Sequence, residues 1–89
     1  MIARRYIVKG RVQGVGFRYF THQIAQELGV RGWVKNLPNG TVEVYAEGDE
    51  DPIEQLLTGI KKGPSLGFVE DVEVGEVEPE GYRGFSIEW

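Results

Sequence analysis

Hydrophobic residues recur along the chain with two periods, and the switches between these periods predict seven elements. Apolar residues spaced three or four apart over 17–28 and 53–60 are typical of amphipathic helices. Alternation of apolar and polar residues, typical of strands with one buried face, occurs in five segments: 6–12, 30–36, 41–47, 72–74 and 85–89. The predicted order is strand, helix, strand, strand, helix, strand, followed by one short strand.

Turn and cap residues separate these elements. Gly29 follows the first helix as a left-handed C-cap, and Leu37-Pro38-Asn39-Gly40 has the turn chemistry that joins two strands in a hairpin. Asp51 is predicted as the N-cap of the second helix, with Pro52 in its first turn, and Gly63-Pro64 ends that helix.

The order of elements predicts an α+β fold of the ferredoxin-like type. This split βαβ sandwich has an antiparallel sheet with two helices on one face, here with a short extra C-terminal strand. We expect a single domain over residues 1–89, because a chain of this length forms one apolar core. A break in parity between Val74 and Val77 predicts a β-bulge near Gly75.

Composition narrows the classes of function. The chain has no cysteine, which removes thiolate chemistry and fits a reducing compartment, and no apolar run reaches membrane-spanning length. We therefore expect a soluble, cytoplasmic protein that does not bind membranes. A net charge of -4 disfavours nucleic acid as a partner, because nucleic acid is held by excess Lys and Arg. Any anionic ligand then needs a local cationic site.

Such a site is predicted where the first strand meets the first helix. Gly14 and Gly16 let the backbone approach an anion, and the unpaired N–H groups of the first helical turn point toward it. Arg18 in that turn has the wrong sign for the helix dipole, so it favours an anionic partner, and its guanidinium matches two phosphate oxygens. The alternative is that the glycines only make a turn and that Arg18 is solvated.

Asn36 is the second candidate residue. A right-handed crossover through the first helix makes the strand that ends at Asn36 parallel to the first strand, so both strand ends share one edge of the sheet. Ligands of such sheets lie beyond the carboxyl ends of strands, where an amide can orient a water. The alternative is an ordinary turn-entry residue before Leu37-Pro38.

Two segments resemble the signatures of the acylphosphatase family. Val8-Lys9-Gly10-Arg11-Val12-Gln13-Gly14-Val15-Gly16-Phe17-Arg18 is similar to the first signature, and Gly32-Trp33-Val34-Lys35-Asn36 with Gly40, Val42 and Gly48 is similar to the second. The resemblance implies a cytosolic monomer that hydrolyses an acyl phosphate to carboxylate and phosphate, without a metal or other cofactor.

The resemblance also implies roles for individual residues. The family's catalytic arginine and asparagine fall on Arg18 and Asn36, which bind phosphate and orient water, respectively. The phosphate-binding segment falls on Gln13, Gly14, Val15, Gly16, Phe17 and Arg18. The implied partner is a small acyl phosphate, with inorganic phosphate as product and competitive inhibitor.

The chemistry explains why no paired carboxylates or Ser-His-Asp constellation is needed. The departing carboxylate belongs to an acid with a pKa of about 4, so it leaves at neutral pH without a proton from the enzyme. Charge neutralisation and alignment of a water remain, and these dominate phosphoryl transfer. His22 is the one histidine, which cannot build a metal site, and we expect it to be solvated.

Two other functions use the same order of elements. An RNA-binding module would use the uncovered sheet face, on which parity places Lys9, Arg11, Arg31, Trp33, Lys35 and Tyr45. Glu43 and Glu47 on that face, and the lack of spaced aromatic residues in the third strand, weaken this alternative. The second alternative is a non-hydrolytic domain that handles phosphate or carbamoyl phosphate inside a larger assembly. The length of the chain disfavours this alternative.

Overall fold

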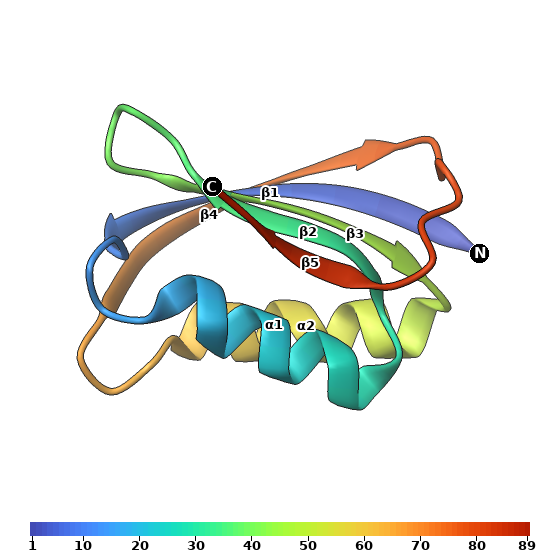
Figure 1. The fold of residues 1–89 in the computed structure, drawn as a ribbon, viewed down its shortest axis with the longest axis horizontal. Helices are drawn as coiled ribbons and strands as arrows, with labels where there is room; N and C mark the ends of the chain where they lie inside the picture. Colours follow the sequence, from blue (N-terminus) through green and yellow to red (C-terminus); the bar gives the residue numbers. More distant parts are fainter.

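Two helices pack against one face of a five-stranded sheet (Figure 1). A computed structural model describes residues 1–89. The elements are β1 (Ile2–Arg11), α1 (Phe17–Leu28), β2 (Arg31–Asn36), β3 (Val42–Gly48), α2 (Glu50–Lys62), β4 (Phe68–Val77) and β5 (Phe85–Glu88). We call the helix-covered side of the sheet the inner face and the other side the outer face. Neither helix has the length and apolar character needed to span a membrane.

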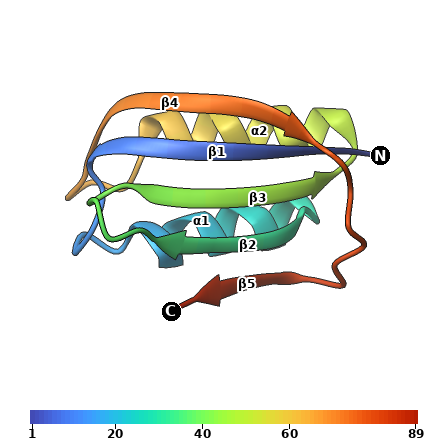
Figure 2. The same cartoon turned by 90° about the horizontal axis from the view of Figure 1, so that it is seen from above.

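The strands lie in the order β4-β1-β3-β2-β5 (Figure 2). β3 is antiparallel to both β1 and β2, so β1 and β2 are parallel to each other on either side of it. The predicted ferredoxin-like fold is therefore confirmed. One part of the prediction needs correction, because β5 pairs parallel with β2, with Gly32 opposite Phe85, and the sheet is mixed rather than wholly antiparallel.

The β-bulge lies at the other end of β4 from the one predicted. Lys9 pairs with Asp71 and Gly10 pairs with Val69, which leaves Glu70 as the extra residue. Gly75 keeps a regular register, so the prediction of a bulge there was wrong. The break in parity has a simpler cause, because Val74 and Val77 lie on opposite faces of a regular strand. Val74 pairs with Tyr6 on the inner face, and Val77 pairs with the buried Ala3 on the outer face.

The start of α2 also differs from the prediction by two residues. Asp49, not Asp51, occupies the N-cap position, with the extended backbone (φ -74°, ψ 156°) that precedes a helix. Asp51 lies in the first turn, where its charge complements the helix dipole, and Pro52 is the third helical residue. The predicted ends of both helices are correct, since Gly29 and Gly63 are their C-caps.

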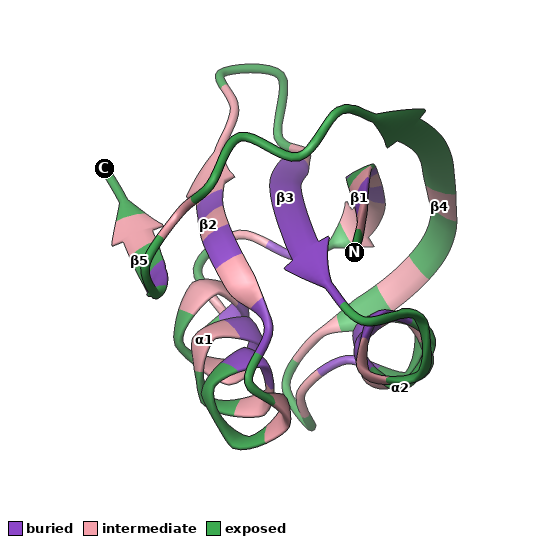
Figure 3. Ribbon diagram, turned by 90° about the vertical axis from the view of Figure 1, so that its right-hand side faces the viewer, coloured by how far each residue is buried: buried purple, intermediate pink, exposed green.

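The core lies between the inner face and the helices, and β3 is its central strand (Figure 3). Alternate residues of β1, β2 and β3 meet the apolar stripe of each helix there, as the periodicity predicted. The most fully buried side chains include Tyr6, Val8, Val34, Val44, Phe17, Ile53, Leu56 and Ile60. Phe17, the first residue of α1, anchors the start of that helix in the core.

Part of the outer face is covered by the segment that connects β4 to β5. Glu47 is fully buried on that face, and its carboxylate accepts hydrogen bonds from the backbone N–H groups of Glu80, Gly81 and Tyr82. The Tyr45 hydroxyl donates to the same carboxylate at 2.7 Å. Burial, reinforced by this hydrogen bond, raises the pKa of Tyr45 to about 12.

Hydrogen bonding decides the charge state of Glu47. Burial by itself would raise the pKa of its carboxyl, but the Tyr45 hydroxyl and the backbone N–H groups of residues 80–82 stabilise the carboxylate and hold its pKa below the ordinary value. The ionised side chain therefore fastens the β4–β5 connection across the sheet.

Glu47 should make the protein less stable in acid. Because the folded-state pKa is lowered, its stabilisation is present above the unfolded pKa and is lost as pH falls through the folded pKa. We expect Glu47→Gln to lower the free energy of unfolding in urea by at least about 2 kcal/mol at pH 7, and by less at pH 3. Exposed Glu27→Gln is the control, expected within about 0.5 kcal/mol of wild type. An equal loss at both pH values would contradict this role for Glu47.

Candidate active site

The loop between β1 and α1 has the backbone of an anion cradle. Gly14 and Gly16 have φ values of 75° and 79°, in the left-handed region that glycine adopts without strain. The first N–H to close α1 belongs to Phe20, which donates to the Gly16 carbonyl at 3.0 Å. The N–H groups of the preceding three residues, 17–19, thus have no acceptor within the helix and remain for a ligand.

Arg18 lies beside this loop and has no carboxylate partner. None of the four ion pairs in the protein involves Arg18, and no acidic residue lies in the first turn of α1. Its guanidinium donates to the Glu88 carbonyl at 3.2 Å and lies over the Trp89 ring, with Cζ at 4.1 Å from the ring centroid. These neutral contacts orient the guanidinium but leave its charge uncompensated, as an anion-binding arginine requires.

A cleft of about 350 Å³ brings most of the predicted site residues together, but Gln13 and Val15 of the predicted phosphate-binding segment do not line it. Gly14, Gly16 and Arg18 line it from the loop and α1, and Asn36 lines it from the end of β2. Arg18 has the only charged side chain in the lining. In Figures 1 and 2 the loop after β1 and the β2–β3 turn lie at the same end of the molecule, as parallel β1 and β2 require.

Gln13 joins the two sides of this cleft. Its side-chain amide donates to the carbonyls of Leu37 and Thr41, at 2.7 and 2.8 Å, on either side of the β2–β3 turn that follows Asn36. The side chain of Gln13 is therefore a brace between loop and hairpin, a role that the sequence analysis did not predict. Asn36, in contrast, makes no side-chain hydrogen bond within the protein, so its amide is free for a water or a ligand.

Residues at the C-terminal end of the chain complete the cleft, and no pattern in the sequence predicted them there. Ile87 and Trp89 line the cleft with Tyr19 of α1. The alternation with Ser86 and Glu88 predicted that Ile87 and Trp89 share one face of a strand. It did not predict which strand this one pairs with. The parallel pairing of β5 with β2, which sets Lys35 opposite Glu88, carries Trp89 to the cleft.

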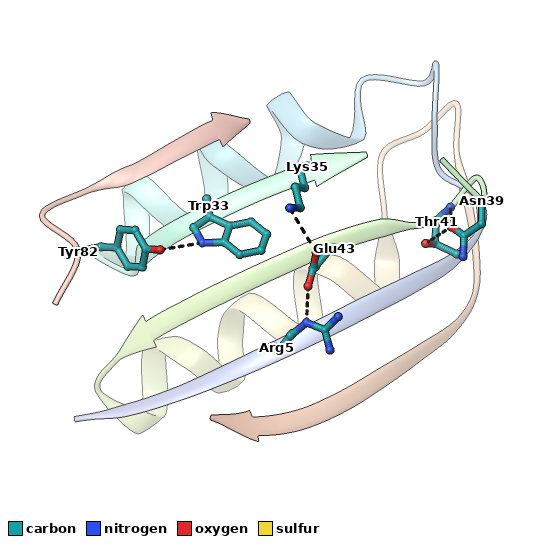
Figure 4. A network of polar contacts seen from close by, with 7 residues as sticks. All are labelled: Arg5, Trp33, Lys35, Asn39, Thr41, Glu43 and Tyr82. Carbon is teal, nitrogen blue, oxygen red and sulfur yellow. Dashed lines mark hydrogen bonds and ion pairs between the residues drawn. The ribbon is translucent and has the colours of Figure 1, made fainter. Parts of the chain in front are cut away.

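The outer face offers less to a nucleic acid than its sequence suggests. Figure 4 shows Glu43 between Arg5 and Lys35, with which it forms ion pairs. Lys9 is likewise paired with Glu73. The basic side chains that parity placed on this face are thus partly neutralised by acidic neighbours.

The aromatic residues on that face are also engaged. Trp33 stacks on Tyr45 with ring centroids 6.0 Å apart. The Nε1 of Trp33 donates to the Tyr82 hydroxyl at 3.1 Å, and Figure 4 shows this second contact. The Tyr45 ring was expected on the uncovered side, but it is only 3% exposed because the β4–β5 connection lies over it. A base cannot stack on a ring that is already covered.

Comparisons with known proteins agree on one family. A family model described as Acylphosphatase matches residues 4–87. An acylphosphatase of Archaeoglobus fulgidus is 51% identical over 98% of this chain and 98% of its own length. The crystal structure of acylphosphatase from Bacillus subtilis superposes with a TM-score of 0.98 at 43% identity, covering all of both chains. The crystal structure of full-length HypF in the phosphate- and nucleotide-bound form matches 99% of this chain over 12% of its own chain (TM-score 0.89, 36% identity).

The brace formed by Gln13 can be tested by stability. Gln13→Leu removes two hydrogen bonds and leaves two carbonyls without this donor, so we expect the free energy of unfolding to fall by about 1–3 kcal/mol. The matched control is Gln55→Leu, an exposed position on α2, expected within about 0.5 kcal/mol of wild type. Denaturant unfolding at pH 7 measures the stability of both variants. If Gln13→Leu is as stable as Gln55→Leu, the side chain of Gln13 does not stabilise the contact between the loop and the β2–β3 turn.

Proposed function

Because this chain belongs to the acylphosphatase family, we propose that Arg18 and the loop amides bind the phosphoryl group of an acyl phosphate while Asn36 orients the attacking water. The enzyme hydrolyses the carboxyl–phosphate bond and releases a carboxylate and inorganic phosphate. The observation that carries the residue assignment is the single cleft lined by Gly14, Gly16, Arg18 and Asn36.

Phosphate binding falls to the loop and Arg18. The phosphoryl oxygens accept hydrogen bonds from the free N–H groups at the start of α1, at the positive end of the helix dipole. The guanidinium of Arg18 neutralises the charge that spreads over these oxygens in the transition state. No metal ion is needed for that neutralisation, since the cleft supplies a permanent cation of its own.

Asn36 is the polar side chain that faces the cradle from β2. Its carbonyl oxygen accepts a hydrogen bond from a water, and its NH₂ group donates to a phosphoryl oxygen, so one amide sets both the position and the direction of attack. The water attacks phosphorus, the bond to the carboxylate oxygen breaks, and the carboxylate leaves with the electron pair. The proton of the attacking water stays on the phosphate product and passes from there to solvent. A leaving group whose acid has a pKa of about 4 needs no proton from the enzyme.

The same cradle accounts for the second product. Inorganic phosphate has the oxygens that the loop binds, so it competes with the acyl phosphate for one site. We further propose that the enzyme acts in the cytoplasm, which is supported by its cysteine-free sequence. We also propose that it acts as a monomer, because one chain supplies all the residues that line the cleft.

The role of each residue can be tested with benzoyl phosphate in the presence of EDTA. Arg18→Ala should lower kcat/KM at least about 100-fold by removing the charge on the phosphoryl oxygens, and Asn36→Ala should lower kcat about 100-fold with a smaller change in KM. Wild-type activity should be unaffected by EDTA.

Matched controls lie in the same part of the fold. Arg11→Ala removes an exposed arginine at the end of β1, and Asn39→Ala removes the other amide of the β2–β3 turn. Both should keep kcat/KM within about threefold of wild type. A wild-type enzyme that is inert, or losses in the controls as large as those in Arg18→Ala and Asn36→Ala, would refute the assignment.

A further inference from the structure

The cleft is larger than the group that its polar end binds. A phosphoryl group of five non-hydrogen atoms fills on the order of 100 Å³, if each atom takes somewhat less than the roughly 30 Å³ of a liquid water. The cleft measures about 350 Å³, at the lower end of small-molecule sites, which span roughly 300–1,000 Å³. The remaining space belongs to another part of the substrate.

The rest of the cleft has an apolar lining. Tyr19, Ile87 and Trp89 belong to that lining, and none of the three lies in the predicted phosphate-binding segment. Tyr19 is 62% exposed and Trp89 is 95% exposed, so large apolar surfaces face solvent at the mouth. Exposed apolar side chains that gather at a cleft are stabilised when a ligand covers them.

Each of these aromatic rings has one contact that orients it. The Tyr19 hydroxyl accepts a hydrogen bond from Gln23, one turn later on α1, at 2.9 Å. The Trp89 ring lies against the Arg18 guanidinium, with the Cζ atom 4.1 Å from its centroid. A ring that is already positioned loses little conformational entropy when a flat ligand packs on it.

We propose that Tyr19, Ile87 and Trp89 form an acyl-group subsite that favours aromatic and other apolar acyl phosphates over small ones such as acetyl phosphate. This inference rests on the proposed function, which places the phosphoryl group at Arg18. With the phosphoryl group held by the loop, the acyl substituent extends from the cradle toward the mouth, where the three side chains lie. The chain therefore selects its substrate through residues outside the phosphate-binding segment.

The test compares kcat/KM for benzoyl phosphate and acetyl phosphate. We expect wild type to prefer benzoyl phosphate, and we expect Tyr19→Ala and Trp89→Ala each to reduce the benzoyl-to-acetyl ratio about 3- to 10-fold, mainly through KM for benzoyl phosphate. Trp89→Ala also alters Arg18, but that effect acts on both substrates and cancels in the ratio. The partners of the Arg18 guanidinium are the Glu88 carbonyl and the Trp89 ring, not the Tyr19 side chain, so Tyr19→Ala should leave the inhibition constant of inorganic phosphate unchanged.

Two control variants separate stacking from other effects. Tyr19→Phe keeps the ring and loses only the hydrogen bond from Gln23, so it should keep the ratio within about twofold of wild type. Phe68→Ala removes an aromatic ring of almost equal exposure, 63%, that does not line the cleft, and it should also retain the ratio.

The outcomes distinguish this inference from the proposed function. Hydrolysis of both substrates with ratios unchanged in Tyr19→Ala and Trp89→Ala overturns the subsite and leaves the acylphosphatase assignment standing. An equal drop in the ratio for Phe68→Ala also overturns it. Failure of wild type to hydrolyse either substrate overturns the proposed function and the subsite with it.

Discussion

The path of the chain from β1 through α1 to β2 is the constraint on which the site depends. β1 and β2 are parallel but are not hydrogen-bonded to each other, because β3 lies between them. Their carboxyl ends therefore lie at the same end of the sheet, which brings the loop after β1 and Asn36 together. Phe17 is buried in the core at the start of α1 and so fixes the position of the preceding loop relative to the sheet. Gln13 then ties the loop to the β2–β3 turn. Positioning of this kind is what phosphoryl transfer to water requires of a protein.

The β4–β5 connection joins the two edge strands of the sheet. That segment leaves one edge strand, crosses the outer face, and returns the chain to the opposite edge beside β2. The buried carboxylate of Glu47 fastens it midway through three backbone N–H groups. The crossing allows β5 to bring Trp89 and the Glu88 carbonyl to Arg18. A charge buried on one face thus supports the geometry of a cleft on the other side of the sheet.

Local patterns in the sequence predicted most of the fold, and they singled out Gly14, Gly16, Arg18 and Asn36, which line one cleft of the candidate site. Hydrophobic periodicity, the Gly29 cap and the 37–40 turn act over a few residues, so they can be recognised without the fold. The pairing of β5 could not be predicted, because four alternating residues fit either edge of a sheet. The brace by Gln13 links residues 24 and 28 positions apart, and no local pattern reports such a contact. The burial of Glu47 could not be predicted, because its partners are mainly backbone N–H groups, which any sequence provides.

The central claim is that the loop from Gly14 to Arg18 and the Asn36 amide together form one phosphate site. Titration of the ¹⁵N-labelled protein with inorganic phosphate, followed by two-dimensional NMR, tests it most directly. The account predicts saturable shifts that are largest for the backbone N–H groups of residues 14–18 and for the side-chain NH₂ of Asn36, and that are lost in Arg18→Ala. Shifts centred elsewhere, for instance on the cleft lined by Arg31 and Arg83, or no saturable shift in residues 14–18, would contradict it.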